Sequence, residues 1–197
     1  MRNSYFSTTG IKNAMGRRIS KSNIGLKRGT VKLVSYDQKW LQSFLLEQKK
    51  LSKIFSLDAL EIQHVGSTAI PGIQAKPIID IVLVVNSLQK VTNHEKKLKA
   101  IGYQKKKNDL RKERLFFTKG PEESRTHYLH IGESGSNYVL DMILFRDYLR
   151  NHKKEARVYS KLKEQLANKY KNSREIYTAK KAKFVKNVIK KAKKSKK

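Results

Sequence analysis

Residues 62–85 read IQHVGSTAIPGIQAKPIIDIVLVV, and this stretch decides the fold. Its first strand ends in a Gly66-Ser67 turn, where the glycine lets the backbone change direction sharply. Its second strand, residues 78–85, is strongly apolar and contains a single carboxylate, Asp80. Burying an ionised side chain costs several kcal/mol unless a partner or a metal ion compensates for the lost water. We therefore expect Asp80 to have a function.

The spacing of apolar residues on both sides of this stretch predicts an α+β fold. Strands are predicted over residues 31–36, 61–65, 78–85, 115–118 and 127–131. Helices are predicted over residues 37–55, 94–101, 149–170 and 173–189. The apolar run 138–145 follows a cap at Ser136 or Asn137 and fits either a helix or a strand.

Length and composition restrict the class of protein. The chain has 197 residues, enough for one domain with a core, and no cysteine. Disulfides, thiolate metal sites and thiol catalysis are therefore excluded, and a cytoplasmic protein is the simplest expectation. No apolar run is long enough to cross a membrane. We expect a basic, disordered extension over residues 1–29, one domain over residues 30–189, and a disordered Lys-rich tail over residues 190–197.

The formal net charge of +29 is concentrated at the two ends. Residues 1–30 contain seven basic and no acidic side chains, and residues 151–197 contain eighteen basic and three acidic ones. Such ends attract nucleic acid non-specifically, or an anionic membrane surface. The alternative is that the lysines are solvated and have no partner. An N-terminal segment without acidic residues is also compatible with a transit peptide.

The Gly66-Ser67 turn and Asp80 together suggest a phosphate site. Glycine allows a ligand to approach the main chain, and the serine hydroxyl with nearby N–H groups can hold a phosphate. A strand carboxylate beside such a turn can place Mg²⁺ against the phosphoryl oxygens of a nucleotide.

The Gly-Ser turn, a spacer and the apolar-Asp-apolar strand resemble the signature of the nucleotidyltransferase superfamily, whose members transfer a nucleoside monophosphate with Mg²⁺. More closely, the blocks HVGSTAIPGIQAKPIIDI, RTHYLHIG, FRDYLRNH and YTAKKAKFV are similar to the GrpB family, in the same order. The resemblance covers residues 31–189. It implies a nucleotidyltransferase-like fold, with a small mixed β-sheet and packed helices, and a nucleoside triphosphate and Mg²⁺ as partners.

The sequence departs from the superfamily at Val82, where a second carboxylate on the same strand face is usual. A two-metal site needs several anionic ligands, so replacements would have to come from elsewhere. We assign catalysis to Asp80 and His130 and metal binding to Asp80 and Asp141, and keep His64, His127 and Asp147 as further candidates. His127 and His130 are three residues apart and face opposite sides of a strand, so at most one can join the site.

Five residues are candidates for holding phosphate: Gly66, Ser67, Lys76, Arg125 and Arg146. Arg146 could bind phosphate with two hydrogen bonds, or form an ion pair within the fold. Lys76 precedes the Asp80 strand and could neutralise the same phosphates, although a loop lysine is more often exposed. His64 could equally hold the Gly66-Ser67 turn by a hydrogen bond.

Two functions of different classes follow. The first is a Mg²⁺-dependent enzyme that transfers a nucleoside monophosphate from a nucleoside triphosphate to an acceptor, by positioning and charge neutralisation. The second is a non-catalytic module that binds a nucleotide or nucleic acid, which the missing carboxylate at Val82 favours. A histidine-carboxylate hydrolase is disfavoured, because no helical His-x-x-x-His pair is present.

Overall fold

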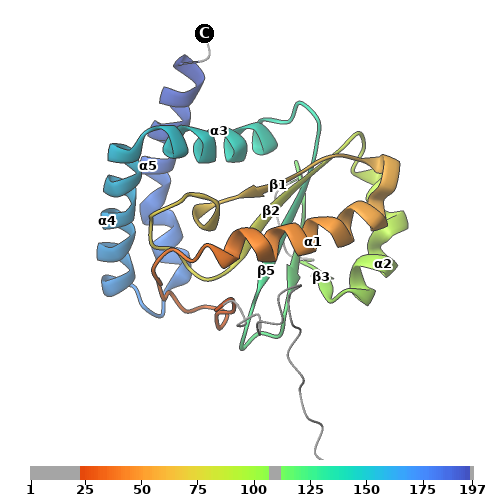
Figure 1. Ribbon diagram of the computed structural model, residues 1–197, viewed down its shortest axis with the longest axis horizontal. Helices are drawn as coiled ribbons and strands as arrows, with labels where there is room; N and C mark the ends of the chain where they lie inside the picture. Colours follow the sequence, from red (N-terminus) through yellow and green to blue (C-terminus); the bar gives the residue numbers. More distant parts are fainter. Residues whose placement is uncertain (1–22, 107–111, 196–197) are drawn as a thin grey trace, which may run out of the picture.

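The computed structural model describes residues 23–106 and 112–195, which form a five-stranded mixed sheet with helices on both faces (Figure 1). The strand order is β1-β2-β5-β4-β3. β2 and β5 are parallel, and the other three neighbouring pairs are antiparallel. The strands are β1 (Ala59–Val65), β2 (Ile79–Val85), β3 (Tyr103–Lys105), β4 (Leu115–Lys119) and β5 (His127–Glu133).

Five α-helices and three short 3-10 helices complete the described fold. The α-helices are α1 (Lys39–Phe55), α2 (Glu95–Ala100), α3 (Asn137–Asn151), α4 (Lys153–Lys169) and α5 (Arg174–Lys194). The 3-10 helices are η1 (Ser56–Asp58), η2 (Ser67–Ala69) and η3 (Gln89–His94). In Figure 1, α1 crosses the sheet, while α4 and the first part of α5 lie next to each other below α3, and α5 continues past α3 to the C-terminal end. None of the helices in the described ranges is both long and apolar enough to span a bilayer.

The central strand β2 separates the two faces by its alternation. Its residues Ile79 and Ile81 pack in the main core with Trp40 of α1. The even-numbered side chains of β2 point the other way, and Val82 packs there with Val139 of α3. Asp80 is two residues from Val82 on the same strand, so its side chain lies on the same face, which α3 covers.

The α+β fold and the mixed sheet predicted from the sequence are confirmed. The apolar run 138–145 is helical within α3, and the Ser136 hydroxyl accepts a hydrogen bond from the backbone N–H of Val139. The strand predicted over 31–36 is wrong. Its only ladder contact within the described residues is a bridge between Val34 and Ala75. Val31 instead donates its N–H to the Lys171 carbonyl between α4 and α5.

The ordered fold extends past both predicted boundaries of the domain. At the start, Leu26 is buried and pairs with Arg125 through two backbone hydrogen bonds, so part of the expected disordered extension is structured. At the end, α5 continues to Lys194, because Ala192 is buried and Lys193 forms an ion pair with Asp141. The disorder expected for residues 1–22 and 196–197 lies outside the described residues.

Candidate functional site

A cleft of about 350 Å³ opens between the sheet and helices α3, α4 and α5. It contains the Gly66-Ser67 turn and Asp80, as the sequence predicts, together with Lys76 and His130. The remaining polar and charged side chains that line it are Thr68, Arg114, Tyr128, Tyr138, Tyr159, Lys163, Arg174, Tyr177, Thr178 and Lys181. Five of the lining residues are Lys or Arg, and one, Asp80, is acidic.

Gly66 lies directly against the carboxylate of Asp80. Val65 and Asp80 are partners in the antiparallel pairing of β1 and β2, so the turn after β1 passes over Asp80. Gly66 has a φ of +70°, and a Cβ at this position would lie 2.5 Å from Oδ2 of Asp80. Only glycine therefore fits here without moving the carboxylate.

Asp80 is partly open to the cleft, with 30% of its side chain exposed. Nε2 of His130, on the parallel strand β5, lies 3.5 Å from its Oδ1. Burial raises the pKa of Asp80, but His130 and the positive charges of Lys76 and Arg174 together outweigh burial and lower that pKa. Asp80 is therefore ionised at neutral pH.

The orientation of His130 follows from the donors around it. Nη1 of Arg114 lies 2.9 Å from Nδ1 of His130, and the Tyr138 hydroxyl lies 2.8 Å from the same nitrogen. A guanidinium group can only donate, so Nδ1 is an acceptor and the proton of the neutral ring is on Nε2. His130 thus directs an N–H group toward Asp80, and Arg114 and Tyr138 hold it in that position.

Four of the cations at the cleft form no ion pair with a carboxylate of the described residues: Lys76, Lys163, Arg174 and Lys181. Arg174 is held by a 2.6 Å hydrogen bond to the Tyr128 hydroxyl, with its guanidinium 4.9 Å from the centre of that ring. Lys76 and Lys181 both lie over the ring of Tyr177. The cations are therefore positioned by tyrosines and backbone, not by acidic partners.

These cations repel one another. Burial, together with the charges of Arg174 and Lys181, lowers the pKa of Lys76 to about 7. Lys163 is 1% exposed and donates to the Gln74 carbonyl. Burial, with the charges of Lys181 and Lys76, lowers its pKa to about 7 as well. Positive charge gathered without anionic partners destabilises a fold unless a ligand supplies the negative charge.

Six of the predicted site residues lie outside this cleft: Arg125, Asp141, Arg146, Asp147 and the histidines His64 and His127. Arg125 donates to the Gly120 carbonyl and closes the hairpin between β4 and β5. Arg146 is buried, where it donates to the His64 carbonyl at 2.9 Å and pairs with Asp147 at 2.7 Å. Asp141 pairs with Lys193 at 2.6 Å. Each of these side chains has a partner within the fold, and the structure does not bring them to Asp80.

The two other histidines face α1, on the opposite side of the sheet. His64 stacks on Phe44 and hydrogen-bonds to Thr68, so it holds the turn that follows β1. Burial lowers the pKa of both His64 and His127 to about 4, so both rings are neutral at pH 7. His127 and His130 thus lie on opposite faces, as their spacing predicts.

The cleft fits one divalent cation better than two. Asp80 is the only carboxylate that lines it, and no group of three His, Cys, Asp or Glu residues that could hold a metal occurs in the described ranges. Val82, where a second acid would be expected, is fully buried beneath α3. Mg²⁺ is often held by one or two carboxylates plus substrate phosphates and water. Asp80 can serve as the one protein ligand of an ion shared with a phosphorylated substrate.

The sequence reasoning missed Arg114, Lys163, Arg174 and Lys181. Lys163 carried a signal, because it follows Tyr159 by four residues and precedes Ala167 by four, which places a lysine in a buried helical row. Lys181 has the same relation to Tyr177 on α5. A lysine inside an apolar helical row is the pattern that would have identified them.

The fold and the cleft define a small α+β protein whose cleft contains five Lys or Arg side chains and, among the described residues, a single ionised aspartate. The chain belongs to the GrpB family, because the profile described as GrpB protein matches residues 30–191. UPF0157 protein YqkA of Bacillus subtilis is 36% identical over 187 residues, covering 95% of this chain and 54% of that protein. The chain thus spans about half the length of this relative.

Solved structures also resemble the fold. GrpB from Enterococcus faecalis superimposes with a TM-score of 0.78 at 33% sequence identity, covering 83% of this chain and 98% of that chain. A more distant likeness, to the Cid1 poly(U) polymerase, has a TM-score of 0.42 at 16% identity and covers 66% of this chain and 45% of that chain. A score this low does not support a comparison of sites.

Proposed function

We propose that the cleft binds a nucleoside triphosphate and that the protein transfers its nucleoside monophosphate to an acceptor. One observation carries the proposal: Lys76, Lys163, Arg174 and Lys181 line the same cleft as Asp80 and form no ion pair with a carboxylate of the described residues. A triphosphate supplies the negative charge that these cations lack. It also supplies the oxygen ligands that a cation on Asp80 would need.

The residues of the cleft have distinct roles in this proposal. The Gly66-Ser67 turn allows a phosphate to approach the backbone next to Asp80. Lys76 and Arg174 neutralise the phosphate chain, and His130 orients the carboxylate through its Nε2–H. When bound, Mg²⁺ offsets the charge that develops on the transferred phosphoryl group. In-line transfer requires mainly this positioning and charge neutralisation, so no covalent nucleophile is needed.

The rival function is metal-free binding of a nucleotide without transfer, and the burial of Val82 beneath α3 favours it. The two functions predict opposite effects of Asp80→Asn. If Mg²⁺ joins Asp80 to the phosphates, the substitution weakens triphosphate binding in Mg²⁺. If binding is metal-free, the substitution removes the one carboxylate that the described residues contribute to the cleft, and it tightens binding.

The test is the affinity of labelled ATP and CTP, measured with Mg²⁺ and with EDTA, for wild type and Asp80→Asn. Asp37→Asn is the matched control, because Asp37 accepts a hydrogen bond from the Lys39 N–H near the start of α1 and asparagine can do the same. We expect Mg²⁺-dependent binding that Asp80→Asn lowers by about tenfold or more, and Mg²⁺-dependent release of pyrophosphate once an acceptor is added. Wild-type affinity that is the same in Mg²⁺ and in EDTA, and that is tighter for Asp80→Asn under both conditions, supports the rival, and no binding by wild type overturns both.

A further inference from the structure

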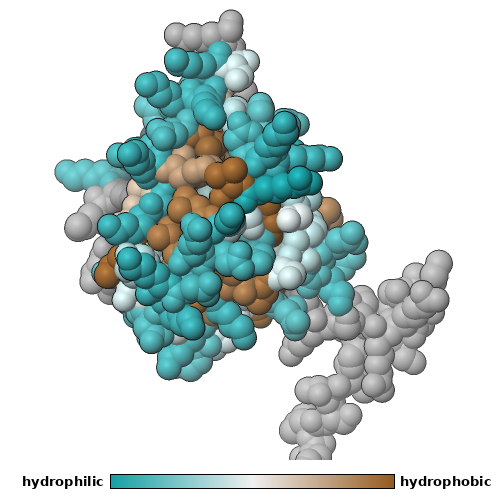
Figure 2. Space-filling model, turned by 90° about the vertical axis from the view of Figure 1, so that its left-hand side faces the viewer, coloured by the Kyte–Doolittle hydropathy of each residue, from teal (hydrophilic) through white to brown (hydrophobic). Residues whose placement is uncertain are grey.

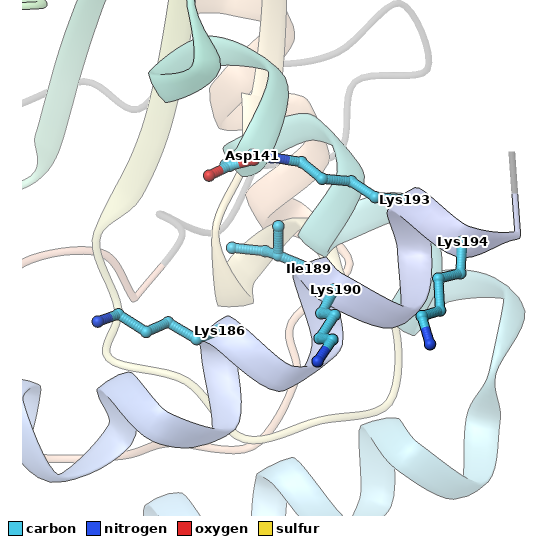
Figure 3. A pocket seen from close by; sticks show the side chains of 6 residues that line it. All are labelled: Asp141, Lys186, Ile189, Lys190, Lys193 and Lys194. Carbon is cyan, nitrogen blue, oxygen red and sulfur yellow. Dashed lines mark ion pairs between the residues drawn. The ribbon is translucent and has the colours of Figure 1, made fainter. Parts of the chain in front are cut away.

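A second hollow, of about 470 Å³, lies where α5 passes α3. Figure 3 shows its lining, in which Ile189 and Lys193 of α5 extend toward Asp141 of α3. Lys190 and Lys194 extend from α5 in the opposite direction, away from Asp141. We call this hollow with its lysines the α5 groove; its α5 residues are Lys186, Ile189, Lys190, Lys193 and Lys194.

The α5 groove is next to the central cleft. Lys186 of the groove follows Val185, which lines the cleft, and Asp141 of the groove precedes Met142, which also lines the cleft. The same two helices, α3 and α5, therefore form walls of both hollows.

The lysines of the groove are spaced along the helix and are available for binding. Lys186, Lys190 and Lys194 are four residues apart, so they rise by about 6 Å per step on one side of α5. All three are exposed, and none forms an ion pair within the described residues. Lys193 is different, because it pairs with Asp141 and fastens the end of α5 to α3.

The residue types on this surface favour a strand of nucleic acid over a membrane as the ligand. Seen from the side of α4 and α5, hydrophilic residues cover most of the surface, with hydrophobic ones between them (Figure 2). A helix that binds membranes presents a broad apolar face to the bilayer. In the groove the apolar contribution is Ile189, and four of the six lining residues are lysines.

We propose that the α5 groove binds single-stranded nucleic acid and that the end of this strand reaches the cleft as the acceptor. The inference rests on the proposed function for the role of that end, and on the groove itself for the binding. Regularly spaced lysines bind successive phosphates without reading the bases, so we expect affinity that depends on salt and not on sequence.

The test uses the full chain and a fluorescent single-stranded RNA of mixed sequence. The groove variant is Lys186→Gln, Lys190→Gln and Lys194→Gln together, and the control variant is Lys49→Gln, Lys53→Gln and Lys96→Gln. The control lysines are exposed on α1 and α2, so both variants lose the same charge from helix surfaces. Glutamine has nearly the same helix propensity as lysine, so neither variant is expected to unfold.

We expect the groove variant to bind the RNA at least about tenfold more weakly at low salt, and its log–log salt slope to be shallower by about 2. The control variant should bind within about twofold of wild type. Equal losses in both variants would show that total charge alone attracts RNA and would overturn the inference. It is also overturned if the groove variant loses binding to phosphatidylserine vesicles but keeps RNA binding.

Binding of labelled ATP by itself separates this inference from the proposed function. The groove variant should bind ATP as wild type does, because its three lysines do not line the cleft. If wild type binds RNA through the groove but no nucleotide, the proposed function fails and the groove stands. If wild type binds nucleotide but shows no groove-dependent RNA binding, the inference about the groove fails and the proposed function stands.

Discussion

The two faces of the sheet differ in whether their buried charged side chains have partners of opposite charge. On the α1 face, Glu47 is 3% exposed and is paired with Lys119 at 2.6 Å and with Lys50 at 3.2 Å. On the cleft face, Lys163 is 1% exposed and its side chain meets a carbonyl group and other cations instead of an acid. Within the described fold, the buried acid of the α1 face therefore has cationic partners, whereas on the cleft face we propose that a ligand supplies the missing negative charge.

The same strands build both faces, and this explains how the two coexist. β5 directs His127 to the α1 face and His130 to the cleft, and β2 does the same with Ile81 and Asp80. The α1 face contains most of the apolar core, so it stabilises a fold whose other face is left charged. The difference predicts that changes on the α1 face reduce stability, whereas changes in the cleft reduce binding.

The largest effect should come from breaking the paired charge on the α1 face. Burial raises the pKa of Glu47, but the hydrogen bond from Lys119 and nearby positive charges lower it, so the side chain is ionised. Glu47→Gln leaves Lys119 partly buried without its partner, and we expect the free energy of unfolding to fall by about 4 kcal/mol. Urea denaturation measures this change.

The control for that experiment is Glu95→Gln, which removes an ion pair with Lys105 at the surface. Exposed pairs contribute roughly 0 to 1 kcal/mol, so the control should denature almost as wild type does. If the two variants lose the same stability, the paired charge on the α1 face is not what distinguishes the two faces.

Acid should destabilise the α1 face through its neutral histidines. The pKa of His127 is about 4 in the fold and about 6.5 unfolded, so only the unfolded chain takes up a proton as pH falls below 6.5. Between pH 7 and pH 5 this costs on the order of 2 kcal/mol. His127→Gln should lose that share of the pH dependence in urea denaturation, and the exposed His152→Gln should keep it. A pH dependence that is the same in both variants contradicts the prediction.

In the cleft, Gly66→Ala tests whether the turn must lie against Asp80. The new methyl group has to displace Oδ2 of Asp80, so we expect triphosphate affinity to drop by about tenfold or more. The free energy of unfolding should fall by about 1 kcal/mol, because φ is +70°. Gly135→Ala is matched, since it has a φ of +78° but open space at Cβ. It should lose similar stability and keep full affinity; a loss of affinity in both variants would remove the special role of Gly66.

Much of this arrangement can be predicted from the sequence, because strands carry a local signal. The alternation around Asp80 predicts β2, and the two-residue period places His130 and His127 on opposite faces. The Gly66-Ser67 turn follows β1 directly, so its position beside Asp80 depends on one pairing. These site residues are close in sequence or lie on neighbouring strands.

The cations of the cleft could not be found in the same way. Arg174 and Lys181 reach the cleft because α5 packs against α3, and no local pattern specifies that packing. The sequence predicts that Arg125 and Arg146 bind phosphate, because arginine suits that ligand, yet in the fold each guanidinium donates a hydrogen bond to a backbone carbonyl. Residue type alone cannot separate these two uses, since both satisfy the same donors.

The smallest change in stability, and the clearest contrast with Glu47, is expected at Lys163. Its pKa of about 7 means that the fold disfavours the charged form, so Lys163→Met should change the free energy of unfolding by no more than about 1 kcal/mol, in either direction. Triphosphate affinity should still fall, because one positive charge is lost.

In wild type, triphosphate affinity should weaken as pH rises from 6 to 8.5, because Lys76 and Lys163 lose their protons near pH 7. Lys163→Met should have a weaker pH dependence, whereas Lys161→Met, an exposed lysine on the same helix, should match wild type. An affinity that does not change with pH would mean that the ligand does not meet these two lysines, and the cleft face would then need another explanation for its unpaired charge.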